Sequence, residues 1–98
     1  MKYQIYQTDN RDYIFMGFQF AMKYGFKRAD YEEKYAGEIE SDAPIGAILD
    51  QVFIRHNRDD RPCGQTMRSL SISDVVVLEG KPYYCDSWGW SEIPGERW

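Results

Sequence analysis

The chain has 98 residues, the length of one small domain, and its 43% hydrophobic and 16% aromatic residues can supply a core. Its net charge of −4 argues against sequence-independent binding to DNA or RNA, which requires a basic surface. No apolar run approaches the roughly 20 residues that span a bilayer, and the N-terminus shows no secretory signal. We therefore expect a single domain over residues 1–98 that is soluble and cytoplasmic and makes no membrane contact.

The first part of the chain predicts a strand and a short helix. Residues 2–8 alternate polar and apolar side chains, and this period of two is typical of a half-buried strand. Residues 17–24 predict a helix, because their apolar side chains recur at helical spacing (Phe18, Ala21, Met22) and a glycine follows. Local pattern leaves the residues just before this helix open between a short strand and a lead-in to the helix.

Residues 33–39 predict the next strand, with tyrosines on its inner face and carboxylates along its rim. Acidic side chains also extend to both sides of it, giving the set Asp30, Glu32, Glu33, Glu38, Glu40 and Asp42. Two interpretations stay open for this rim. It is either a solvated strand edge that charge keeps soluble, or a surface that docks on a basic partner.

The second predicted helix has the clearest pattern in the chain. Pro44 suits its first turn, where a missing N–H costs nothing, and Ser41 and Asp42 offer caps. Apolar residues then mark one helical face, which ends near His56 and Asn57: Ile45, Ile48, Leu49, Val52 and Phe53. A loop over residues 57–68 follows, in the most basic part of the chain, around Arg55, Arg58, Arg61 and Arg68.

The last third of the chain predicts a β-hairpin. Residues 75–78, Val-Val-Val-Leu, are the β-branched run of a strand predicted over 75–79, Glu79-Gly80 is a favoured two-residue turn, and residues 82–90 are the return strand. Together with the two earlier strands, the hairpin gives an α+β fold. We expect an antiparallel sheet of about four strands, with both helices packed on one face and the hairpin at the C-terminal end.

Few residues offer chemistry. His56 is the single histidine, and at a helix end we expect it to have a structural role rather than to act as general acid or base. Cys63 and Cys85 form no CxxC pair, so reduced thiols are expected, with a single disulfide as the alternative. The sequence has no metal-ligand cluster, no GxGxxG and no Walker loop. We therefore expect neither a metal nor a cofactor.

An aromatic segment ends the predicted return strand. If residues 82–90 form one strand, then Tyr84, Asp86, Trp88 and Trp90 share a face. Such a face could stack on a base, a sugar or a partner side chain. Alternatively, its rings could complete the core against the second helix. Without a basic groove, protein contact is favoured over nucleic-acid stacking.

The run RSLSISDVV at residues 68–76, followed by Gly80 and by YYCDSWGW at residues 83–90, resembles the YodL-like domains. These are small domains of Gram-positive bacteria, their phages and their conjugative elements. The segment YAGEIE before a helix fits the same order, and Trp88 and Trp90 stand where Phe-type residues are expected. The resemblance implies an accessory protein of a mobile element, a setting in which small proteins often bind and block host proteins, including defence nucleases such as CRISPR effectors.

These observations lead to one main hypothesis and two alternatives. The main hypothesis is a non-enzymatic, anti-CRISPR-like binder that modulates or inhibits a host or defence protein. Its candidate contacts are Glu32, Glu33, Glu38, Glu40, Asp42, Tyr84, Trp88 and Trp90, with Trp98 as a further aromatic side chain. The alternatives are a nucleic-acid-binding module that uses Arg55, Arg58, Arg61 and Arg68, and a small enzyme around His56.

Overall fold

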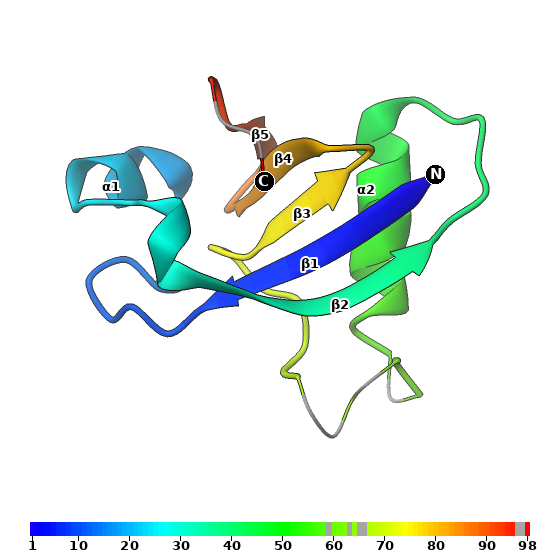
Figure 1. Cartoon of the computed structure of the whole chain (residues 1–98), viewed down its shortest axis with the longest axis horizontal. Coiled ribbons are helices and arrows are strands. Elements are labelled where there is room, and N and C mark those ends of the chain that lie inside the picture. The colour runs from blue at the N-terminus through cyan, green and yellow to red at the C-terminus, as the bar shows by residue number, and fades with distance from the viewer. Residues whose placement is uncertain (59, 63, 65–66, 96–97) are drawn as a thin grey trace.

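The computed structural model describes residues 1–58, 60–62, 64, 67–95 and 98, and these form an α+β fold (Figure 1). A five-stranded antiparallel sheet has the order β2-β1-β3-β4-β5. Its strands are β1 (Lys2–Thr8), β2 (Tyr31–Glu38), β3 (Val75–Leu78), β4 (Lys81–Asp86) and β5 (Gly89–Glu92). The helices are α1 (Phe18–Lys23) and α2 (Ile45–Arg55). The predicted fold class is therefore confirmed, with five strands in place of about four.

The segment before α1 is neither a strand nor a helix. It is a series of turns, closed by hydrogen bonds from the Ile14 N–H to the Asn10 carbonyl at 3.0 Å and from the Met16 N–H to the Tyr13 carbonyl at 3.0 Å. Tyr13 lies fully buried within these turns. Among the described residues, no helix is long and apolar enough to cross a membrane.

The predicted hairpin between β3 and β4 is confirmed. Glu79 and Gly80 connect the strands with φ angles of 49° and 84°, and two consecutive positive φ angles are what a two-residue I′ turn requires. The register pairs Leu78 with Lys81 and Val76 with Tyr83. All four residues of β3 are buried.

The single return strand predicted over residues 82–90 is wrong. The chain turns at Ser87 and Trp88, so that β4 and β5 form a second hairpin at the edge of the sheet. The Asp86 carboxylate accepts the Ser87 N–H at 2.8 Å, and Gly89 follows with a φ of 151°. An Asp that accepts a local backbone N–H and a glycine with positive φ are both turn signals, and here they outweigh the strand propensity of the surrounding aromatic residues.

The two helices lie on opposite faces of the sheet, so the prediction that they share one face is also wrong. Ile48, Leu49 and Val52 of α2 pack on one set of sheet residues: Tyr3, Ile5, Val76, Leu78 and Tyr83. Ala21 of α1, with Phe18 packed beside it, joins the alternate set: Tyr6, Val75, Val77 and Tyr84. Figure 1 also shows the helices near opposite ends of the strands.

This two-sided arrangement has a physical cause in β3. Residues Val75–Leu78 are apolar without interruption, so both faces of the strand must be covered. A strand with one wet face would alternate apolar and polar side chains instead. The run of four apolar residues was therefore the available signal that the sheet is buried on both sides at its centre.

Candidate protein-binding surface

A cleft of about 390 Å³ lies between α1 and the turn that joins β4 to β5. The residues that line it are Gly17, Phe18, Gln19, Phe20, Asp86, Ser87, Trp88 and Ser91. Two of its aromatic side chains are exposed to solvent, Phe20 to 39% and Trp88 to 76%. Trp88 is exposed because it occupies the turn rather than a strand.

The short helix α1 leaves most of its apolar side chains in solvent. Ala21 is its single buried residue, and Phe18 packs half-buried on Tyr84 with ring centroids 4.9 Å apart. Phe20 instead stacks on Tyr24, with centroids 4.3 Å apart and planes 26° from parallel. Met22, which the helical spacing placed with the inner residues, is 55% exposed.

Exposed apolar side chains are concentrated around this helix. Nine large apolar residues are exposed in the described part of the chain, and six of them lie in α1, within three residues of its ends, or at the cleft. Phe20 and Trp88 line the cleft and Tyr24 stacks on Phe20, while Phe15, Met16 and Met22 lie in α1 or just before it. We call these six residues the α1 surface. Scattered exposed apolar residues are ordinary, but a group of them with several aromatic rings is typical of a protein-interaction site.

The Asp86 carboxylate lines the same cleft as the two exposed rings. Asp86 is half-buried, and its Oδ1 accepts the Ser87 N–H at 2.8 Å while its Oδ2 accepts the Ser91 hydroxyl at 2.8 Å. A Cβ atom on Gly17 would stand 2.9 Å from Oδ1, so the glycine permits the start of α1 to approach this carboxylate. No ion pair involves Asp86 within the described part of the chain.

The other aromatic residues of the C-terminal segment contribute to packing. Tyr84 is fully buried, and its hydroxyl donates to the Met16 carbonyl at 2.6 Å, so it belongs to the core rather than to a binding surface. Trp90 is half-buried against Phe53, and its Nε1 donates to Asp50 at 3.0 Å. The turn at residues 87–88 therefore separates Trp90 from Trp88, which the single-strand prediction had placed on one face.

Trp98 is also half-buried and packs on the aromatic cluster on the α1 side of the sheet. Its ring lies edge-on to Tyr31 and Tyr6, at centroid distances of 5.1 and 5.2 Å, and is stacked on Phe26 at 6.1 Å. The Arg28 guanidinium lies 5.4 Å from the centroid of the Trp98 ring. Of the three tryptophans, Trp88 thus has by far the most accessible ring.

The predicted acidic contacts are exposed and lie around the opposite edge of the sheet from β5. Glu32, Glu33 and Glu38 belong to the edge strand β2, and Glu40 and Asp42 follow it on the way to α2. Lys34 lies 3.3 Å from Glu32, and Glu33 accepts the Tyr6 hydroxyl at 3.3 Å. The carboxylates thus charge an open strand edge, and Asp86 is the acidic residue that the structure brings beside an exposed tryptophan.

The arginines of the predicted basic region are largely engaged within the fold. Arg68 donates to both oxygens of the buried Asp74, at 2.6 and 2.8 Å. Arg55 donates to the Tyr3 hydroxyl at 3.1 Å and to the Glu38 carbonyl at 3.0 Å. Arg58 pairs with Asp60 at 3.1 Å, and Arg61 donates to the Arg58 carbonyl at 3.4 Å.

His56 ends α2, as predicted, and is fully buried. Its Nε2 lies 2.8 Å from the Tyr3 hydroxyl, and its ring lies edge-on to Tyr35 with centroids 4.7 Å apart. Burial, with a smaller effect of the Arg55 charge, lowers the pKa of His56 to about 4. The imidazole is therefore neutral at physiological pH and holds α2 against β1.

The cysteine that the structure describes is unsuited to nucleophilic chemistry. Cys85 is buried, and this burial, with nearby carboxylates, raises the pKa of its thiol to about 12. The thiolate is the nucleophilic form, and at neutral pH almost none is present. Cys63 lies outside the described residues, so the predicted reduced state of that cysteine and the alternative of a disulfide stay predictions. Within those residues, no group of His, Cys, Asp or Glu could hold a metal ion.

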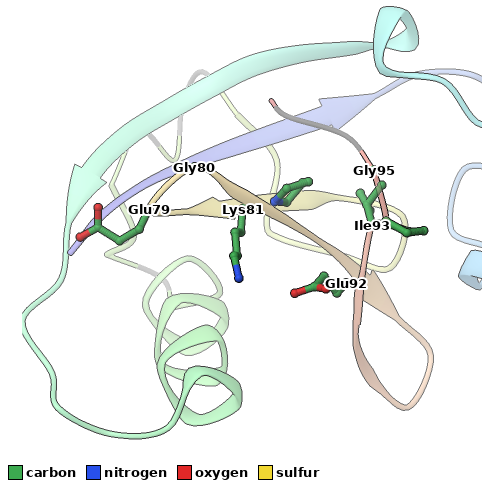
Figure 2. A pocket seen from close by; sticks show the side chains of 8 residues that line it. Glu79, Gly80, Lys81, Glu92, Ile93 and Gly95 are labelled. Atoms are coloured by element: carbon green, nitrogen blue, oxygen red, sulfur yellow. The ribbon is translucent and has the colours of Figure 1, made fainter.

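A second cleft of about 390 Å³ lies at the other end of the C-terminal strands. Charged side chains of Glu79, Lys81 and Glu92 surround it, as Figure 2 shows, and Ile93 and Gly95 form part of its wall. It has charges of both signs and no aromatic side chain among its lining residues. It therefore lacks the exposed rings that distinguish the cleft beside α1.

Comparisons with known proteins place the chain in a family. Neither a search of curated proteins nor a search of solved structures found a match to it. A family model of the YodL-like domain matches residues 1–95, which cover all the strands and both helices described above. The chain belongs to the YodL-like domain family.

Proposed function

We propose that this YodL-like domain is a non-enzymatic accessory protein of a mobile genetic element that binds a host protein and modulates or inhibits it. Defence nucleases such as CRISPR effectors are among the targets that this function would include. The binding site is the α1 surface, and Trp88 is its principal contact. The proposal thus keeps Trp88 from the predicted contacts and replaces Tyr84 and Trp90 with exposed residues in and beside α1. The predicted acidic contacts on β2 and after it are not part of this site.

The single observation that carries the proposal is the 76% exposure of Trp88 beside a cleft whose other side is an exposed Phe20. A tryptophan ring removes roughly 150–250 Å² from water when it is buried, at about 25 cal/mol per Å². Tryptophan is also the residue type most enriched among the few that dominate binding energies at protein interfaces. A solvent-exposed ring of this size on a turn contributes little to folding. Contact with a partner protein therefore explains this side chain better than packing does.

The placement of the potentially reactive side chains supports a binding role over a catalytic one. His56 is buried and hydrogen-bonded to Tyr3, and the thiol of Cys85 is buried and protonated. A general base must reach the proton that it removes, which a neutral histidine inside the core cannot do without local opening. The internal contacts of Arg55 and Arg68 likewise argue against a nucleic-acid-binding module.

The test compares partner capture by two variants that each shorten one exposed apolar side chain. The tagged full chain is incubated with host lysate, and the captured protein is identified, purified and titrated. Trp88→Ala should weaken its binding by about 30-fold, the loss expected on truncating a dominant interface residue. Ile54→Ala, which alters a 61% exposed residue of α2, should leave binding unchanged. Equal affinities for both variants would contradict the proposal.

A further inference from the structure

We infer that the cleft between α1 and the β4–β5 turn is a receptor for an arginine side chain presented by the partner protein. This inference rests on the proposed function and specifies the chemistry of the partner at that site. It follows from three properties of the cleft: exposed aromatic rings, a carboxylate held in place, and the absence of a cation paired with that carboxylate within the described residues.

The rings provide the faces on which a planar cation stacks. Phe20 is held against Tyr24 by stacking at 4.3 Å, which limits its motion. Trp88 is 76% exposed, so its indole is open to a ligand, and indole is the side chain that attracts cations most strongly through its π face. Both side chains line the same cleft as Asp86.

The Asp86 carboxylate has acceptor capacity left for two further hydrogen bonds. Each of its oxygens already accepts one short bond, Oδ1 from the Ser87 N–H and Oδ2 from the Ser91 hydroxyl, both at 2.8 Å. The Ser87 hydroxyl lies 3.5 Å from Oδ1, the limit of a hydrogen bond. A carboxylate oxygen has two lone pairs, so Oδ2 keeps a free position, and Oδ1 gains one when the long bond from the Ser87 hydroxyl is released. Two adjacent free positions match the parallel N–H groups of a guanidinium.

Charge selects arginine over other occupants. An anion would be repelled by Asp86, and a neutral apolar group would desolvate the carboxylate without compensating its charge. A lysine would supply the charge but neither the planar stacking surface nor the paired N–H groups. The chain as a whole has a net charge of −4, which favours approach of a basic partner surface.

The same combination of groups occurs inside this fold. Arg68 donates to both oxygens of Asp74, at 2.6 and 2.8 Å, and its guanidinium carbon lies 5.4 Å from the centroid of the Phe15 ring. Arg68 thus binds a carboxylate in a bidentate manner while it lies over an aromatic face. The cleft likewise has a carboxylate and two exposed rings among its lining residues, and the partner would supply the guanidinium.

The experiment titrates the full chain with N-acetyl-arginine amide and, separately, with N-acetyl-citrulline amide, which has nearly the same shape and no charge. Two-dimensional ¹⁵N–¹H NMR reports the backbone amides of Gly17 and Ser87 and the indole N–H of Trp88. We expect these signals to shift with the arginine compound, with a Kd on the order of millimolar, and to shift far less with the citrulline compound. Equal shifts with both compounds, or none with either, would overturn the inference.

Single substitutions distinguish binding at this cleft from general attraction to the negative charge of the chain. Asp86→Asn should weaken binding of the arginine compound about tenfold, because it removes a charge-assisted pair. Asp42→Asn, which removes an equally negative and exposed side chain elsewhere, should leave the affinity unchanged. Trp88→Leu keeps apolar bulk but removes the π face, so it should also weaken binding of the arginine compound. Because this variant leaves Asp86 in place, it tests the site even if Asp86→Asn disturbs the turn. Equal losses in Asp86→Asn and Asp42→Asn would show non-specific attraction only.

Binding of the captured partner shows whether the arginine site or the proposed function has failed. If that partner binds Asp86→Asn as tightly as the unaltered chain, the arginine site is wrong while the binding function stands. If the arginine compound binds as expected but Trp88→Ala has no effect on any captured protein, the site stands and the proposed function fails.

Discussion

The Tyr3 hydroxyl and the His56 Nε2 lie 2.8 Å apart in the core and join β1 to the end of α2. The Arg55 side chain donates to the same hydroxyl at 3.1 Å. Burial keeps His56 neutral, and a neutral imidazole satisfies the contact either by accepting the Tyr3 proton at Nε2 or by donating an Nε2–H to the hydroxyl. Protonation of the ring would place a charge in the core, next to the half-buried Arg55 guanidinium.

Stability should therefore fall at mildly acidic pH because of His56. Its pKa is about 4 in the folded chain and 6.5 when the chain is unfolded, so the unfolded chain binds more protons between these values. The contribution is complete above pH 6.5 and declines by about 3 kcal/mol as the pH falls to 4. Urea unfolding of the unaltered chain and of His56→Gln is measured at about pH 7.5, 6 and 5. The difference between their free energies of unfolding should become smaller as the pH falls. A difference that stays constant with pH would show that His56 does not cause the loss of stability in acid.

Removal of Arg68 should destabilise the fold strongly. Asp74 is fully buried and accepts Arg68 at two positions, together with Gln7 and the Ser71 N–H. Arg68→Met leaves the carboxylate without its cation, which costs about 3–5 kcal/mol for a buried pair. The matched control is Arg58→Met, because Arg58 pairs with the exposed Asp60 and its removal should have little measurable effect. The denaturant midpoints of the two variants measure this difference. Equal midpoints would contradict the stabilising role of the Arg68–Asp74 pair.

Two glycines in open space should respond to alanine in opposite directions. A Cβ would meet nothing within 4 Å at Gly80 or at Gly46, but Gly80 has a φ of 84° and Gly46 lies in α2. Gly80→Ala should therefore destabilise the chain by about 1 kcal/mol, whereas Gly46→Ala should stabilise it by up to about 1 kcal/mol. Thermal unfolding would show the midpoint moving down in the first variant and up in the second. A midpoint that stays the same or rises in Gly80→Ala would contradict the I′ turn.

The two tryptophans of the last hairpin should differ in their importance for folding. Trp90→Ala removes the contact with Phe53 and the hydrogen bond to Asp50, and we expect a loss of about 1–3 kcal/mol. Trp88→Ala changes an exposed turn residue, and we expect a change within about 0.5 kcal/mol. Chemical unfolding monitored by far-UV circular dichroism measures both. A large loss in Trp88→Ala would assign Trp88 to the core and remove it from the proposed surface.

Sequence patterns were sufficient where local rules dominate. The strand over residues 2–8, the second helix and the Glu79-Gly80 turn are all confirmed. The prediction of a single buried face on the strand is wrong, because consecutive residues from Ile5 to Thr8 are all buried, and Ile45 of the predicted helical face is exposed. The turn at Ser87 and Trp88 was missed because aromatic residues have high strand propensity, although Asp86 and Gly89 flank it with turn chemistry. This one error placed Trp90 with Trp88 and extended the return strand.

The proposed binding surface follows only in part from the sequence, for a reason of tertiary structure. Trp88 was identified from its residue type, but the exposure of Phe20 and Tyr24 depends on how a six-residue helix sits on the sheet. Apolar side chains at helical spacing normally indicate a buried face. Here α1 is too short to bury more than one residue, which no local pattern reveals. The buried contact of His56 likewise depends on Tyr3, which lies 53 positions away in the chain.

The two packed faces of the sheet share no core side chain, since α2 covers one set of strand residues and α1 the alternate set. A substitution that changes the α1 side need not alter the α2 side, apart from changes to the backbone of β3. Residues of the α1 side can therefore be substituted while the α2 side continues to hold the sheet together.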